Sequence, residues 1–120
     1  MSDQQLTNTK RWSKVRRSQR IELTVAVVVH SPIKGGPQFS ERAQTLVVNA
    51  HGALVALTEK VTIKQRLLMQ NIVSGEQKEC RVVYVKKDVT GPTKVAVEFS
   101  KPAPTFWRIA YPPADWTADG

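Results

Sequence analysis

Residues 21–30 alternate with a period of two, and the alternate positions are all branched aliphatic side chains: Ile21, Leu23, Val25, Val27 and Val29. Successive side chains of a β-strand point to opposite faces, and β-branched residues favour strands. The segment is therefore predicted to be one long strand that buries one face. This pattern directs the whole chain toward a β fold.

Five further segments have the same character and are separated by turn-forming residues: Ala43–Val48, Ala53–Leu57, Arg66–Ile72, Gln77–Lys86 and Thr93–Phe99. A Pro- and Gly-containing loop at 31–40 and turns at 49–52, 74–76 and 88–92 divide them. Residues 58–65 contain no strong breaker and are left unassigned. Six short strands without a long helix predict an all-β sandwich or barrel.

Three local expectations follow from the pattern. Cys80, Val82 and Tyr84 are predicted to share one strand face, opposite Arg81, Val83 and Val85. Val95, Val97 and Phe99 are predicted to share a face of the last strand. Gly52 is the last residue of a predicted turn, where its freedom to adopt a positive φ would allow the chain to reverse direction.

The segment Lys101–Trp116 differs from the rest, with four of the seven prolines and two of the three tryptophans. A helical turn over Pro104–Ile109 would place Phe106 and Trp107 on the barrel. The favoured interpretation is a hydrophobic plug over an open barrel end. A protein-binding surface is the alternative.

The positive charge is concentrated near the start of the chain. The net charge is +8, and residues 1–20 contain six basic residues and one acid, so they carry +5 of it. Residues 1–20 are therefore predicted to be a basic arm, separate from a domain of residues 21–120. The excess indicates an anionic partner such as nucleotide, nucleic acid or anionic lipid. A solvated tail and an arm that orders around a phosphate are both compatible with it.

The residues that enzymes need are scarce. His30 and His51 are expected to be surface or hydrogen-bonded side chains, and the single cysteine, Cys80, a buried structural thiol. There is no P-loop and no credible catalytic set, so we expect neither enzymatic activity nor a cofactor. A single cysteine, a polar N-terminus and the lack of a membrane-length apolar run predict a cytoplasmic protein.

The basic arm ends in the run Arg16-Arg17-Ser18-Gln19-Arg20, directly before the first strand. A guanidinium is a flat fork that binds phosphate through two hydrogen bonds and stacks on a purine. It can also donate to O6 and N7 of guanine. Arg16 and Arg20 at the mouth of a barrel would suit a guanine nucleotide.

The order of these features resembles the PilZ domain family, bacterial receptors for the second messenger cyclic di-GMP. The chain has RRxxR, a long strand, a turn ending in Gly-Ala-Leu and a Val-Glu-Phe strand, and the resemblance covers about residues 14–116. It implies a six-stranded antiparallel β-barrel and cyclic di-GMP as the ligand. The family's R-x-x-x-R motif is matched by Arg16 and Arg20.

The family's second motif, D/N-x-S-x-x-G, is matched imperfectly. Anchoring it on Gly52 puts Asn49 at the serine position and Val47 at the acidic position, while anchoring it on Asn49 puts His51 at the serine position. The first register is preferred. Val47 cannot accept from guanine, which leaves a polar edge at a cost of about 1–3 kcal/mol if it is desolvated. Asn49 would partly compensate, and His51 could stack on a base.

The resemblance thus implies a ligand site made of Arg16, Arg17, Arg20, Asn49, His51 and Gly52. Ligand binding would order the arm and signal to a downstream protein partner. One alternative is a degenerate domain that acts through protein contacts without cyclic di-GMP, and another is a different cyclic dinucleotide. A nucleic-acid binder ranks third, because no stacking platform is evident outside the arm.

Overall fold

The computed structural model describes residues 19–32, 39–110 and 112–118. These residues form seven antiparallel strands and one short helix, α2 (Asp115–Ala118). The strands are β1 (Ile21–Glu22), β2 (Ala26–His30), β3 (Ser40–Asn49), β4 (Gly52–Leu57), β5 (Arg66–Asn71), β6 (Gln77–Lys86) and β7 (Thr93–Phe99). Within the described ranges, no helix has the length and apolar character that a membrane crossing requires.

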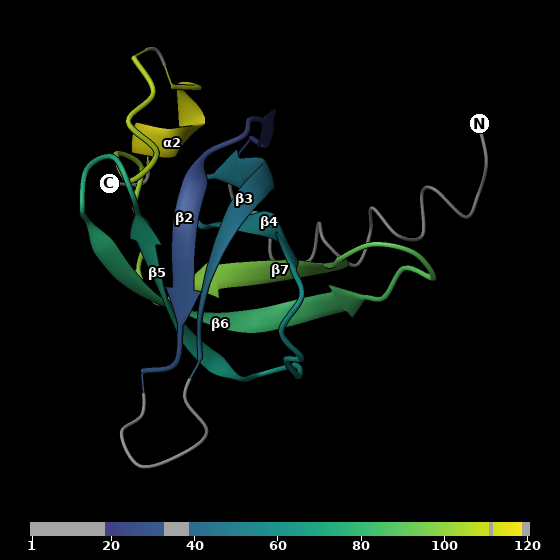
Figure 1. Ribbon diagram of the computed structural model, residues 1–120. Coiled ribbons are helices and arrows are strands. Elements are labelled where there is room, and N and C mark those ends of the chain that lie inside the picture. The colour runs from purple at the N-terminus through teal and green to yellow at the C-terminus, as the bar shows by residue number, and fades with distance from the viewer. Residues whose placement is uncertain (1–18, 33–38, 111, 119–120) are drawn as a thin grey trace, which may run out of the picture.

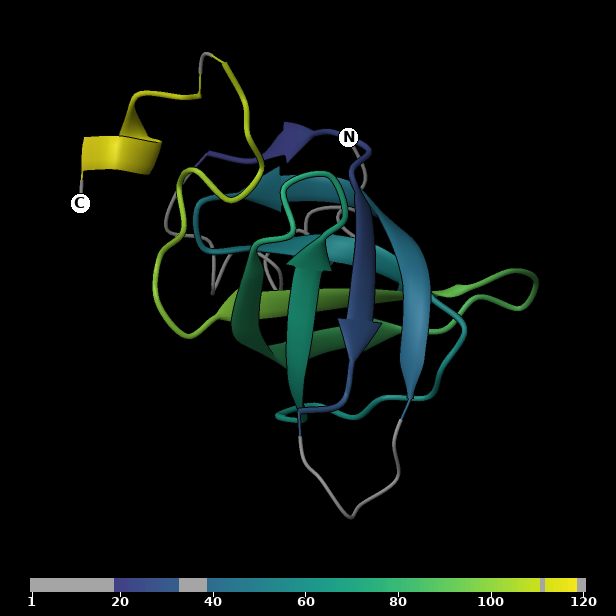
Figure 2. The ribbon, with the colours of Figure 1, turned by 60° about the vertical axis from the view of Figure 1, so that its left-hand side comes forward.

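Six of the strands close into a barrel in the order β3-β2-β5-β6-β7-β4, with β4 pairing back onto β3 (Figures 1 and 2). The extra strand, β1, pairs with β3 beside β2. The predicted all-β barrel is therefore confirmed. Branched aliphatic side chains fill its interior, and Val95, Val97 and Phe99 share the inward face of β7, as predicted.

The single strand predicted over residues 21–30 is wrong, because it is interrupted between β1 and β2. The Thr45 side chain enters the gap, where its hydroxyl donates to the carbonyl of Leu23 and accepts from the amide of Val25. β3 continues past the interruption and pairs with both halves. The predicted apolar face persists, since Leu23 and Val25 still pack against the core.

The predicted alternation along β6 is also wrong beyond Val82. A β-bulge falls between Val82 and Tyr84 in the pairing with β7. An extra residue in one strand shifts the following side chains to the opposite faces. Val85, rather than Tyr84, therefore packs against the core, and Tyr84 pairs with Ala96 on the other face.

Gly52 does not serve the turn through a positive φ. It is the first residue of β4, and among the described residues Gly75 and Gly91 are the glycines with positive φ. A Cβ atom on Gly52 would instead collide with the backbone carbonyl oxygen of Val97 on β7. Glycine is required here because two strand backbones approach closely.

The turns predicted at residues 74–76 and 88–92 are present, and they join β5 to β6 and β6 to β7 as antiparallel pairs. Residues 58–65 form an irregular connection between β4 and β5. Its start is fixed by Glu41, whose carboxylate accepts from the backbone amides of Thr58 and Glu59.

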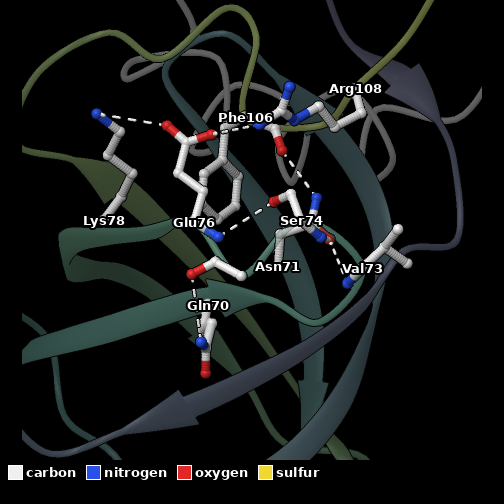
Figure 3. Close-up of polar contacts among 9 residues, drawn as sticks. Gln70, Asn71, Val73, Ser74, Glu76, Lys78, Phe106 and Arg108 are labelled. Carbon is white, nitrogen blue, oxygen red and sulfur yellow. Dashed lines mark hydrogen bonds and ion pairs between the residues drawn. The ribbon is translucent and has the colours of Figure 1, made fainter.

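After β7 the chain makes tight turns over residues 103–108, with hydrogen bonds from Phe106 N to Ala103 O and from Arg108 N to Thr105 O. Phe106 and Trp107 are buried, and their rings lie 4.8 Å apart, edge to face. Figure 3 shows how this segment is attached to the β5–β6 turn. The Asn71 amide donates to Phe106 O at 2.8 Å, and Arg108 lies 3.9 Å from Glu76.

Candidate functional site

The pairing of β1 with β3 brings the end of the arginine motif beside the β3–β4 turn. Ile21 pairs with Val48, so Arg20, the preceding residue, lies next to Asn49 in the register. Arg20 is half-buried. Two segments that are far apart in the sequence therefore form one corner of the barrel. Arg16 and Arg17, the other predicted arginines, lie outside the described residues.

The three predicted turn residues are buried and held by hydrogen bonds. The Asn49 side chain is 1% exposed, and its Oδ1 accepts from the amide of His51 at 2.8 Å. This contact is an Asx turn, in which an Asn side chain stabilises its own turn. His51 is 8% exposed, and its carbonyl accepts from the amide of Phe99 at 2.7 Å. The turn is therefore a rigid part of the barrel.

Val47, which occupies the acidic position of the preferred motif register, is half-buried. It pairs with Glu22 on one side and with Leu54 on the other. The row continues through Ala96 on β7 to Tyr84 on β6. The side chains of this row face outward. Those at its centre, Val47, Leu54 and Ala96, are apolar, and the β6 bulge places Tyr84 at its end. The alternation along β6 gave no signal for Tyr84, because a bulge leaves the hydrophobic pattern almost unchanged.

A surface pocket of about 370 Å³ adjoins the turn, and its lining residues are Arg66, Glu79, Cys80, Arg81, Glu98, Phe99 and Ser100. Glu98 pairs with Gly52 across the β4–β7 ladder, which places the pocket beside the turn. Arg81 donates to the Glu98 carboxylate at 3.1 Å, and Arg66 lies 3.9 Å from Glu79. The charges in this pocket are therefore paired with one another.

Cys80 reaches the pocket only marginally, since it is 1% exposed. Burial, and secondarily the charge of Glu79, raise the pKa of its thiol from 9.0 to about 12. A protonated thiol is a weak nucleophile and a poor metal ligand. The prediction that Cys80 is a buried residue is confirmed. Among the described residues, no three His, Cys, Asp or Glu side chains gather where they could hold a metal ion.

The C-terminal segment, residues 101–116, contacts the candidate corner from two directions. At its start, the amide of Ala103 donates to Ala50 O at 2.7 Å, and Trp107 Nε1 donates to Asn49 O at 2.8 Å. At its end, Asp115 and Trp116 hold Gln19, the residue before Arg20. Figure 2 shows the segment passing along the side of the barrel where β1 and the β3–β4 turn lie. The contacts to Gln19 were not predicted from the sequence, although the tryptophan at position 116 was a sign that the end of this segment packs against the barrel.

No family model matches the chain, and no curated protein is significantly similar to it.

Proposed function

We propose that the protein is a receptor for cyclic di-GMP, the ligand that its PilZ-like order of motifs implies. The observation that carries the proposal is the pairing of Ile21 with Val48, which sets Arg20 beside the Asn49–Gly52 turn. The six-stranded barrel and the +5 charge of residues 1–20 support it. The ligand is a dianion with two guanine bases, which suits a guanidinium group beside a hydrogen-bonded turn, with further arginines at positions 16 and 17.

In this proposal the arginines supply most of the affinity. Arg16, Arg17 and Arg20 bind the phosphates and the guanine O6 and N7 atoms. The Asn49 side-chain oxygen is already used in the turn, and Val47 offers no acceptor. The turn therefore contributes shape and backbone groups more than side-chain recognition. We expect the affinity to fall strongly when one of the arginines is removed, and only moderately when guanine is replaced by another base.

Calorimetric titration with cyclic di-GMP tests the proposal. We expect micromolar or tighter binding by the full chain, abolished by Arg16→Ala or Arg20→Ala. Arg42→Ala is the matched control, because Arg42 is an exposed arginine on β3 that pairs with Val28, away from the corner. Equal losses in all three variants would indicate nonspecific attraction of charge. Absence of binding by the unmodified chain would refute the proposal.

A second candidate is a degenerate domain that acts by protein contacts. The buried, engaged Asn49 side chain and the apolar Val47 favour it, because neither offers an acceptor to a guanine edge. Such a domain would ignore cyclic di-GMP and other cyclic dinucleotides in the same titration. A nucleic-acid binder would instead bind single-stranded oligonucleotides regardless of base, with affinity that falls steeply with salt.

A further inference from the structure

The residue Gln19 lies inside the arginine motif and is held through both of its backbone polar groups. Its amide donates to Asp115 Oδ2 at 2.9 Å, and its carbonyl accepts from Trp116 Nε1 at 2.6 Å. The Trp116 side chain is 2% exposed and belongs to the hydrophobic core. Because the indole is anchored in the core, its N–H fixes the position of the Gln19 peptide. Arg20, the next residue, is fixed with it.

The same C-terminal segment is attached to the turn half of the corner. Ala103 donates to Ala50 O, and Trp107 Nε1 donates to Asn49 O. Asn71 donates to Phe106 O and Phe106 packs against Phe99, so residues 103–107 are anchored on the barrel. The C-terminal segment thus contacts the β3–β4 turn through Ala103 and Trp107, and Gln19 through Asp115 and Trp116.

We propose that the C-terminal segment is a positioning element for the ligand site, in which Asp115 and Trp116 hold Gln19 and Arg20 in register with the turn. The inference rests on the proposed function and says how the C-terminal segment regulates ligand binding. A ligand that binds the ordered arm pays less conformational entropy when Gln19 is already held. Coupling is reciprocal, so ligand binding also stabilises the C-terminal segment. A change in the arm is thereby transmitted to residues 103–116.

The first test needs no ligand and measures amide hydrogen exchange at Gln19 by NMR. Trp116→Phe keeps an aromatic ring in the core and removes the indole N–H, and Asp115→Ala removes the other partner. We expect each to speed exchange at Gln19 by about fivefold or more, as loss of one hydrogen bond implies. Asp115→Asn keeps an acceptor oxygen and should restore most of the protection. Unchanged exchange in Trp116→Phe and Asp115→Ala would overturn the proposal.

The control variant is Arg108→Gln, which removes an ion pair of the same segment at 3.9 Å from Glu76 without touching Gln19. It should leave Gln19 exchange unchanged. Trp107→Phe cuts the attachment at the turn end and should also speed exchange at Gln19 if one segment couples the two halves. An effect of Trp107→Phe confined to the turn would contradict the coupling.

The second test measures cyclic di-GMP binding kinetics in the same variants. Loss of the contacts to Gln19 should weaken cyclic di-GMP binding by about fivefold. The main change should be slower association, because Arg20 would be in its binding-competent position in a smaller fraction of the molecules. Leu67→Val, a core deletion on β5, controls for simple destabilisation and should leave association unchanged. Equal association rates in Trp116→Phe and the unmodified chain would overturn the proposal.

The two proposals fail in different ways. If the unmodified chain does not bind cyclic di-GMP, the proposed function is refuted while the exchange measurements still decide whether Asp115 and Trp116 hold Gln19. If the chain binds but neither variant alters association, the positioning role is refuted and the receptor function stands.

Discussion

The Thr45 hydroxyl donates a 2.6 Å hydrogen bond to the carbonyl of Leu23, which lies in the gap between β1 and β2. The same oxygen accepts from the amide of Val25 at 2.8 Å. A side chain thus satisfies two backbone groups that a regular ladder would have paired. Since Thr45 is fully buried, water cannot replace it.

Thr45→Val should therefore destabilise the protein by about 2 kcal/mol, because it keeps the shape and leaves buried backbone groups unpaired. Urea unfolding followed by circular dichroism measures the change. Thr45→Ser retains the hydroxyl and should cost clearly less. A cost for Thr45→Val no larger than that for Thr45→Ser would contradict the role assigned to the hydroxyl.

Gly52→Ala should cost about 3 kcal/mol or more, or prevent folding, because the added Cβ meets the Val97 carbonyl of a neighbouring strand. Gly75→Ala provides the comparison. Gly75 has a φ of 78° and open space around it, so the strain should cost only about 1 kcal/mol. Soluble yield and thermal melting rank the two variants. A milder effect at Gly52 than at Gly75 would contradict the close approach of β4 and β7.

Asn71 is buried and joins the β5–β6 turn to the C-terminal segment. Its Oδ1 accepts from the amide of Val73 at 3.0 Å, and its Nδ2 donates to Phe106 O at 2.8 Å. Asn71→Ala should destabilise by about 2–3 kcal/mol, since it leaves several buried groups unpaired. Asn71→Asp keeps the acceptor and loses the donor, so chemical shifts near Phe106 should change while those near Val73 remain. Denaturant melts and NMR spectra separate these effects.

The raised pKa of the Cys80 thiol predicts a loss of stability at alkaline pH. Its folded value is about 12 and its unfolded value 9.0, so between these pH values the folded state holds a proton that the unfolded state has released. The free energy of unfolding therefore falls as pH rises above about 9. At pH 10.5 the contribution of this group is on the order of 2 kcal/mol.

Urea melts at pH 8 and pH 10.5 measure that loss, and Cys80→Ala supplies the background from the other titrating groups. The variant should be less stable at pH 8, because it leaves a cavity, but its stability should fall less with pH. Parallel pH profiles would show that the thiol does not titrate differently in the two states.

The strand pattern was predictable where hydrophobic alternation follows burial directly. Val95, Val97 and Phe99 face the core because each contributes its own transfer free energy, whatever its neighbours do. The two interruptions of that pattern were not predictable. The gap after Glu22 depends on a hydroxyl of β3, and the bulge at Val83 depends on pairing with β7. Both partners lie on other strands, so the alternation within one strand carries no sign of them.

The candidate site was predictable in its parts and not in its assembly. Guanidinium chemistry pointed to Arg20, and the resemblance to the PilZ family pointed to Asn49–Gly52. Only the β1–β3 register places them side by side. The hold of Trp116 on Gln19 joins residues 97 positions apart, a separation at which local pattern carries no information.

The hydrogen bond from Trp116 to Gln19 also brings the beginning and the end of the described chain together. Gln19 and Trp116 meet near the two ends of the described chain, whereas the β6–β7 connection projects from the barrel, with Val89 fully exposed (Figure 1). A short linker between the two meeting ends, with new termini opened near Val89, would give a circular permutant whose strand pairings are all retained. Reporter groups fused near residues 19 and 116 would sit next to each other at the same corner as Arg20.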